Sequence, residues 1–232
     1  MSDLVALLRQ LVQAELAKMS TSAIGVVEAA GDHADGDTAN YGCDVRLRGR
    51  DVVFAGVPIA TDHLGTVALP NKGDVVLLQF VGGDQSQPVI VGRLYSEALR
   101  APAYAANEIH TWLPPDAGES DQIQLDVVGG GSGKRSWSLK MPSDLEITVA
   151  DKKVEVKVKN LTVTLDGDGG EATLKSQSGT VTVKDGGDVK VEAGGNLELS
   201  AKGNVEISAS GNLTLKASAN AELKGAMVSL GS

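Results

Sequence analysis

The sequence predicts an all-β protein with an N-terminal helix, a small antiparallel barrel and a C-terminal needle in which three identical chains intertwine as a triple-stranded β-helix. Three observations predict this class. One eight-residue unit, the octad, repeats six times between Ser178 and Gly225. Short alternating strands separated by turns fill the stretch from Ile24 to Leu94. Aromatic residues make up only 3% of the 232 residues, beside 28 glycines, which suits thin β architecture better than a large enzyme core.

Residues 1–21 form the first predicted segment, and residues 3–19 within it have the pattern of an amphipathic helix. One broad helical face carries most of its apolar residues: Leu4, Leu8, Leu11 and Val12, with Leu7, Leu16 and Met19 close by. Two interpretations stay open. The helix packs on its own domain, or it docks onto a partner or trimerises.

Residues 22–97 are predicted to form a small barrel, with an OB-type Greek key as the first candidate. Phe54 and Phe80 are expected in its core rather than stacked on nucleic-acid bases, because acidic residues match or exceed basic ones in most loops. Cys43 is expected to be a small core residue rather than a nucleophile. The expected strands are Ile24–Glu28, Tyr41–Arg48, Asp51–Val57, Gly65–Leu69, Asp74–Val81 and Pro88–Leu94.

Residues 98–144 are predicted to be a collar that joins the barrel to the needle. Prolines and the glycine-rich run at 129–133 punctuate two short strands there, Ile123–Val128 and Ser136–Met141.

Residues 145–232 are predicted to be the needle, since alternation begins at Leu145, Ile147 and Val149 and becomes strict in the octads. Each octad is a strand of about five residues followed by a Gly-Asn type corner. Positions four and six are apolar in every octad, and they supply the predicted trimer core: Val181, Val183, Val189, Val191, Leu197, Leu199, Val205, Ile207, Leu213, Leu215 and Leu223.

The short octad predicts a homotrimer. A single-chain β-solenoid needs about 20 or more residues per turn to enclose its interior. Eight residues cover only one face of a triangular prism, so three chains, each contributing one face, would close the core and leave no lateral sheet edge exposed.

The charge balance argues against some classes of binding partner. Net charge is −9, and such a surface would repel nucleic acid and anionic lipid head groups. Cys43 is the one cysteine, so no intrachain disulfide can form. No secretory signal pattern and no run of about 18 apolar residues is visible. We therefore expect synthesis in the cytoplasm without a signal peptide.

The stretch Pro70–Tyr95, PNKGDVVLLQFVGGDQSQPVIVGRLY, resembles the OB-fold signature of phage baseplate assembly protein V and of VgrG-type spikes. That signature has Pro and Gly-Asp before an apolar strand, then Phe, Gly-Asp, Pro and a closing apolar-Gly-x-Leu-Tyr. The GNVEISASGNLTLKA repeats resemble the triple-stranded β-helix that follows this domain in those proteins. Together the two resemblances cover most of residues 22–232.

The resemblance implies a central spike at the tip of a contractile tail, as in phages, tailocins, extracellular injection systems and type VI secretion. Such a spike docks on the baseplate hub through its helix and barrel and contacts the target envelope only transiently while piercing it. The particle that carries it is extracellular, either a contractile injection system or a phage tail baseplate.

The needle tip is expected to lack metal chemistry, because His33, His63 and His110 all precede the needle and no His-x-His apex is present. The ending KGAMVSLGS resembles the blunt end of spikes that a separate PAAR-type tip protein caps. That resemblance implies a tip-protein interface at Met227, Val228 and Leu230.

A non-enzymatic role without a cofactor is expected. Glu108, His110 and Asp116 could be imagined as acid/base partners, but no sequence feature fixes them near a cleft. Two alternatives stay open. A receptor- or glycan-binding tail fibre would need distal pockets, and residues 178–232 contain no aromatic residue. A cell-wall-degrading enzyme would need a carboxylate pair in a cleft.

Overall fold

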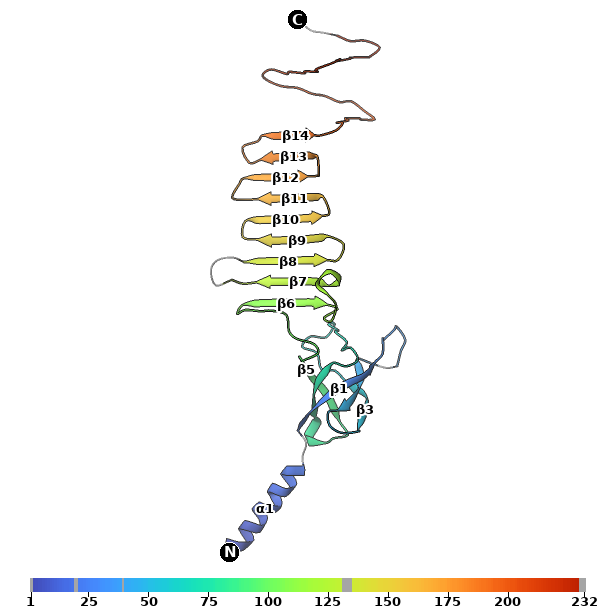
Figure 1. The fold of residues 1–232 in the computed structure, drawn as a ribbon, viewed down its shortest axis with the longest axis vertical. Helices are drawn as coiled ribbons and strands as arrows, with labels where there is room; N and C mark the ends of the chain where they lie inside the picture. The colour runs from blue at the N-terminus through green and yellow to red at the C-terminus, as the bar shows by residue number, and fades with distance from the viewer. Residues whose placement is uncertain (1, 19–20, 39, 131–134, 230–232) are drawn as a thin grey trace. The chain divides into compact units, whose positions relative to one another are not determined.

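The computed structural model describes residues 2–18, 21–38, 40–130 and 135–229. The chain divides into two compact units, Met1–Asp151 and Lys152–Ser232. The fold is all-β apart from one α-helix and two short 3₁₀ turns in this described part (Figure 1). The first unit holds the helix, a curled five-stranded sheet and four further strands, and the second unit holds five strands.

The helix α1 spans Ser2–Lys18, close to the predicted 3–19. Its Leu, Ala, Gln and Glu residues are strong helix formers. Val5, Leu7, Leu8, Leu11 and Val12 are each at least half exposed. In the single chain, therefore, these side chains are not buried against their own domain.

The curled sheet is the predicted barrel. Its five antiparallel strands are β1 (Ser22–Ala30), β2 (Gly42–Leu47), β3 (Val53–Pro58), β4 (Val75–Phe80) and β5 (Pro88–Leu94), in the order β3-β2-β1-β4-β5. The 3₁₀ turn η1 (Val81–Gly83) joins the last two. A parallel bridge between Ile59 and Ile90, with the Ala60 N–H donating to the Ile90 carbonyl at 2.8 Å, brings the two ends of the sheet together. This closure supports the OB-type prediction.

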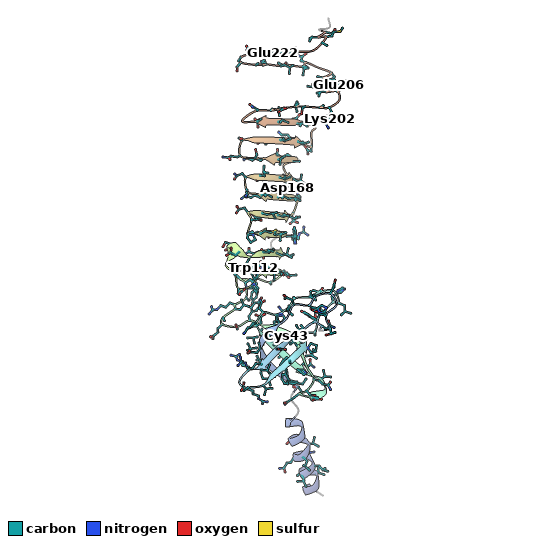
Figure 2. The ribbon with its side chains drawn as sticks, turned by 90° about the vertical axis from the view of Figure 1, so that its right-hand side faces the viewer. Cys43, Trp112, Asp168, Lys202, Glu206 and Glu222 are labelled. Carbon is teal, nitrogen blue, oxygen red and sulfur yellow. The ribbon has the colours of Figure 1, made fainter. Side chains whose placement is uncertain are left out.

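The barrel interior holds the buried core of the molecule. Alternate positions of each strand point inward, as period-2 patterning requires. Cys43, labelled in Figure 2, is buried there as predicted. Phe80 meets the half-buried Phe54 edge to face at 6.0 Å between ring centroids. The buried apolar residues are Val27, Cys43, Val45, Leu47, Val57, Val76, Leu78, Phe80 and Ile90.

The strand predicted at Gly65–Leu69 is wrong. Gly65 has φ +98°, a conformation that breaks an extended strand. The Tyr41 hydroxyl then donates to the Ala68 carbonyl at 2.8 Å and accepts from the Ala68 N–H at 3.1 Å, in place of a neighbouring strand. The segment is therefore a loop held by a tyrosine side chain.

The rest of the first unit is an antiparallel ladder of β6 (Glu108–Leu113), β7 (Ile123–Val128), β8 (Ser136–Met141) and β9 (Leu145–Ala150), each paired with the next. The 3₁₀ turn η2 (Glu119–Asp121) lies between β6 and β7. The bounds of β7 and β8 match the prediction, whereas β6 was not predicted.

The second unit is a similar ladder of β10 (Lys153–Val158), β11 (Leu161–Asp166), β12 (Glu171–Lys175), β13 (Gly179–Lys184) and β14 (Val189–Ala193). Here each strand folds back on its sequence neighbour, and Lys159 at φ +52°, Gly170 at +62° and Gly187 at +90° occupy turn positions. This intrachain pairing is a difference from the sequence analysis, which expected pairing between chains. Residues 194–229 have no assigned strand in the single chain.

Candidate functional site: strands with an exposed apolar face

The register of the second-unit ladder gathers its apolar side chains on one face. Directly opposite residues on paired strands point to the same side of a sheet. Two rows follow from the register: Val156, Val163, Leu174, Val181 and Val191, and next to it Val154, Leu165, Ala172, Val183 and Val189. We call these two rows the second apolar face.

The opposite side of the same strands is polar. Its rows contain Thr, Lys, Glu and Asp residues, such as Thr164 opposite Thr173 and Lys153 opposite Asp166. Neighbouring charges on this side form ion pairs, Lys153 with Glu155 at 3.3 Å and Lys190 with Glu192 at 2.8 Å. Each of these exposed pairs contributes little to stability, about 0–1 kcal/mol. Their presence indicates that this side of the ladder is suited to face solvent.

The burial of β11 is inverted relative to an ordinary surface strand. Leu161, Val163 and Leu165 are exposed, whereas the polar residues between them are half-buried. The apolar side chains further along the ladder, including Leu174, Val183, Val189 and Val191, are also exposed. A contiguous exposed apolar surface of this kind marks an interaction site.

The first-unit ladder repeats this inversion. In β6, Ile109, Thr111 and Leu113 are exposed while the polar residues between them are half-buried. The register continues these positions into two rows, Ile109, Val127, Trp137 and Val149, and Thr111, Leu125, Leu139 and Ile147. We call them the first apolar face. Ile109, for example, is 67% exposed.

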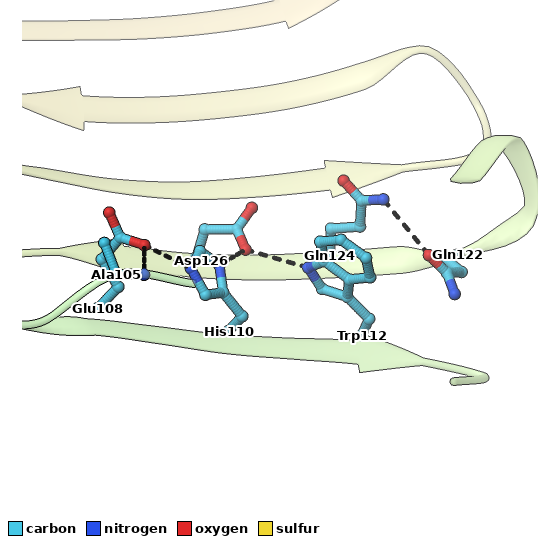
Figure 3. A network of polar contacts seen from close by, with 7 residues as sticks. All are labelled: Ala105, Glu108, His110, Trp112, Gln122, Gln124 and Asp126. Atoms are coloured by element: carbon cyan, nitrogen blue, oxygen red, sulfur yellow. Dashed lines mark hydrogen bonds and ion pairs between the residues drawn. The ribbon is translucent and has the colours of Figure 1, made fainter. Parts of the chain in front are cut away.

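The other side of the first-unit ladder carries a network of polar contacts centred on His110 (Figure 3). The Asp126 carboxylate lies 2.6 Å from His110 Nδ1 and accepts from Trp112 Nε1 at 3.1 Å. The Glu108 carboxylate lies 3.1 Å from His110 Nε2 and accepts from the Ala105 N–H at 2.8 Å. Both ring nitrogens therefore face a carboxylate oxygen.

This geometry favours the imidazolium form of His110. Its pKa is raised because the Asp126 carboxylate, and then the Glu108 carboxylate, accept hydrogen bonds from the charged ring. The pKa of Glu108 is lowered by the hydrogen bond from His110 and by that from the Ala105 N–H. The network ties β6 to β7 on the polar side.

A loop covers part of this polar side. Buried Gln122 donates through Nε2 to the carbonyl oxygens of Pro114 at 3.1 Å and Ala117 at 2.9 Å. Buried Gln124 donates to Gln122 Oε1 at 3.4 Å. Among the described residues no buried side-chain nitrogen or oxygen lacks a partner. The polar side is thus a satisfied surface, and the apolar side is the one that lacks cover.

The predicted trimer-core residues fall into two groups. Val181 and Val183 on β13, and Val189 and Val191 on β14, lie on the second apolar face. The others lie in the segment without strands and are exposed in the single chain: Leu197, Leu199, Val205, Ile207, Leu213, Leu215 and Leu223. Figure 2 marks this segment with Lys202, Glu206 and Glu222. Of the predicted tip residues, Met227 and Val228 are exposed, and Leu230 lies outside the described residues.

The three residues weighed as acid/base partners from the sequence do not all meet in the structure. Glu108 and His110 meet, but their third partner is Asp126 rather than Asp116. Sequence reasoning missed Asp126 and Trp112; the one local signal was the alternation of apolar and polar residues at 123–127, which places Gln124 and Asp126 on one side of a strand. In the described part of the chain, no group of three or more His, Cys, Asp or Glu residues is arranged to hold a metal ion. No described helix is long and apolar enough to span a membrane.

Residues 48–95 match the family model of the Type VI secretion system/phage-baseplate injector OB domain. This match confirms the resemblance of Pro70–Tyr95 to the OB-fold signature of baseplate protein V and of VgrG-type spikes. The matched residues contain β3, β4 and β5, and β1 and β2 complete the same sheet upstream of the match. No curated protein matches the chain. The injector OB domain supports a baseplate-associated structural role, in an extracellular virion or injection particle.

Proposed function

We propose that this chain is the homotrimeric central spike of a contractile tail or injection system, a structural protein without catalytic activity that pierces the target envelope. One observation carries the proposal: the inverted burial of β6 and β11, one in each ladder after the injector OB domain. Satisfied polar groups cover one side of the ladders, and the other side exposes rows of Val, Leu and Ile.

Three copies would give the apolar faces their cover. If the faces of three chains turn toward one axis, each Val or Leu side chain that becomes fully buried contributes about 1.5–3 kcal/mol. The polar sides, with their ion pairs, then form the outer surface. The net charge of −9 per chain keeps the assembly soluble.

The segment after β14 supports the same arrangement. Its octads keep the apolar alternation of β13 and β14, yet in a single chain they have no assigned strand partner. Strands need paired N–H and C=O groups, and other chains would supply them as a triple-stranded β-helix. The needle would then transmit axial force during sheath contraction.

The two ends of the spike take different partners in this proposal. The exposed side chains of α1 and the injector OB domain dock on the baseplate hub. The C-terminal end, with Met227 and Val228 exposed, receives a PAAR-type tip protein. Contact with the target envelope is transient and mechanical.

Two neighbouring residues on β13 test the proposal. Val181 belongs to the second apolar face, and Thr182 points to the polar side of the same strand. Val181→Asp places three carboxylates around one level of the proposed axis, so we expect loss of the trimer, because each unpartnered buried charge costs several kcal/mol. Thr182→Asp introduces the same charge on the outside and should leave the trimer intact.

Light scattering on the purified proteins gives the readout. The unmodified protein and Thr182→Asp should have three times the 23.9 kDa chain mass, and negative-stain images should show a threefold particle with a thin needle. A stable, monodisperse monomer of the unmodified protein would refute the spike.

A further inference from the structure

The loop between β3 and β4 exposes two large apolar side chains. Leu64 is 87% exposed and Val67 is 75% exposed. The loop around them is ordered by its own hydrogen bonds. Thr61 Oγ1 donates to the His63 carbonyl at 3.0 Å, and the Thr66 N–H donates to the same carbonyl at 3.1 Å. The two Tyr41 bonds to Ala68 fix its far end. We call residues 61–67 the apolar knob.

The same unit contains a small apolar cavity. Val75, Leu94, Tyr95, Leu99 and Pro115 line a space of about 290 Å³. A closed turn holds Leu99 in place, since the Ser96 N–H donates to the Leu99 carbonyl at 2.9 Å and the Leu99 N–H donates to Ser96 Oγ at 3.2 Å. The space is large enough for a leucine side chain, and the walls have the apolar chemistry that a leucine needs.

The charges beside the knob and the cavity are complementary. Asp62 lies in the knob next but one to Leu64, and Arg93 lines the cavity. Neither side chain forms an ion pair within the described part of the chain. Asp74, also at the cavity, accepts from the Asn71 N–H at 2.9 Å. The cavity thus contains both signs of charge, and its unpaired Arg93 is available to form an ion pair with Asp62 of the knob.

We infer that the apolar knob of one copy inserts into the cavity of the next copy around the threefold axis. A threefold assembly requires this type of contact: one patch on each copy meets a different patch on its neighbour, and three such contacts close a ring. The knob does not fill the cavity of its own chain, as the exposure of Leu64 shows. The inference rests on the proposed trimer, and it adds a second, barrel-level contact that fixes how the copies are arranged.

Engineered cysteines test the contact directly. The one native cysteine, Cys43, is buried and does not compete for reagent. In the full chain, Leu64→Cys combined with Leu99→Cys should give covalent dimers and trimers with a short bismaleimide crosslinker. Each single variant alone should give none, because Leu64 of one copy faces Leu99 of the next and not its own counterpart. The two single variants expressed together should give dimers only.

A matched control uses Asp51→Cys with Leu99→Cys, since Asp51 is also an exposed loop residue but lies outside the knob. It should not crosslink. In the Leu64/Leu99 cysteine background, Asp62→Lys or Arg93→Glu alone should lower the crosslinking yield by up to about fivefold, the range of an exposed ion pair, and the two changes together should restore it.

The mass of the same samples separates the two hypotheses. A trimer that crosslinks as described supports the contact. A trimer whose Leu64/Leu99 pair crosslinks no more than the Asp51 control overturns the knob contact and leaves the spike standing. A monomer overturns the proposed spike itself, and the contact with it.

Discussion

Close packing in the five-stranded barrel fixes the identity of single residues. Gly25 on β1 is buried, and a Cβ atom at this position would overlap Val45 Cγ1 on the neighbouring strand. Interiors are packed at crystal-like density and do not absorb an added methyl group without moving other atoms. Gly92 on β5 is also a strand glycine, yet nothing lies within 4 Å of the Cβ that it would carry. The two positions differ in the room available for a Cβ atom.

We expect Gly25→Ala to lower the free energy of unfolding by about 1–3 kcal/mol, the usual cost of overpacking. Gly92→Ala should leave stability unchanged or slightly raise it. Thermal unfolding followed by circular dichroism measures both. A Gly25→Ala protein as stable as Gly92→Ala would mean that the approach of β1 to β2 is looser than described.

The His110 network predicts a pH dependence. The folded-state pKa of His110 is raised above its ordinary value of 6.5, so its stabilisation is fully present below pH 6.5 and is lost as pH rises through the folded-state pKa. The pKa of Glu108 is lowered below 4.5, so its contribution is present above pH 4.5 and is lost as pH falls further. The melting temperature of the unmodified protein should exceed that of His110→Gln most between pH 4.5 and 6.5. A difference that grows above pH 7.5 would contradict the charged ring.

These residues show what the sequence could and could not predict. Cys43 was predicted in the core because it lies in a barrel strand, and Phe80 because the acidic loops argue against a base-stacking role. Asp126 was missed because its partner His110 is 16 positions away, and no local pattern reports a pair across two strands. The strand at Gly65–Leu69 was wrongly predicted because its composition is apolar, whereas a positive φ at Gly65 and the distant Tyr41 decide the conformation.

At the level of elements, β7 and β8 were predicted near their observed bounds because the composition of the glycine-rich run between them is a clear turn signal in the sequence. The strand β6 was missed because its residues 108–113 mix charged, aromatic and aliphatic types, and its inverted burial hides the usual signal. The octad strands beyond β14 were predicted from strict alternation. In the proposed spike their pairing partners are other chains, which a single chain does not contain.

The octad pattern predicts that charge substitutions on the two sides of one strand affect the trimer differently. Val205→Asp or Ile207→Asp should disrupt the trimer and its resistance to heat and detergent, at a cost of several kcal/mol for each buried charge. Glu206→Lys, on the same octad but facing outward, should change little. Light scattering and gel mobility without boiling compare the three proteins. Equal tolerance at all three positions would mean that the strand faces are reversed.

At the level of the whole molecule, the proposed needle would have a strand edge at residues 226–229 without the usual protection against further pairing. Residues 226–229 contain no charge and no proline to prevent further pairing, and Met227 is 87% exposed. A second protein that caps the edge would remove this liability.

Deletion of Ala226–Ser232 should therefore abolish binding of a PAAR-type tip protein and leave the trimer intact. A pull-down with the tip protein, alongside light scattering of the truncated chain, measures both. Equal recovery of the tip protein by truncated and full-length spikes would reject the capping interface.

The contrast between β10–β14 and the octads after them has a kinetic consequence. The strands β10–β14 find their partners within one chain, so their pairing is unimolecular and independent of concentration. In the proposed trimer, residues 194–229 pair only after other copies have bound, so their ordering would be a higher-order step. Once the β10–β14 ladders of three chains associate, the remaining octads are held together at high effective concentration and can pair one after another toward the C-terminal end. Dilution should therefore slow the start of needle assembly far more than its completion.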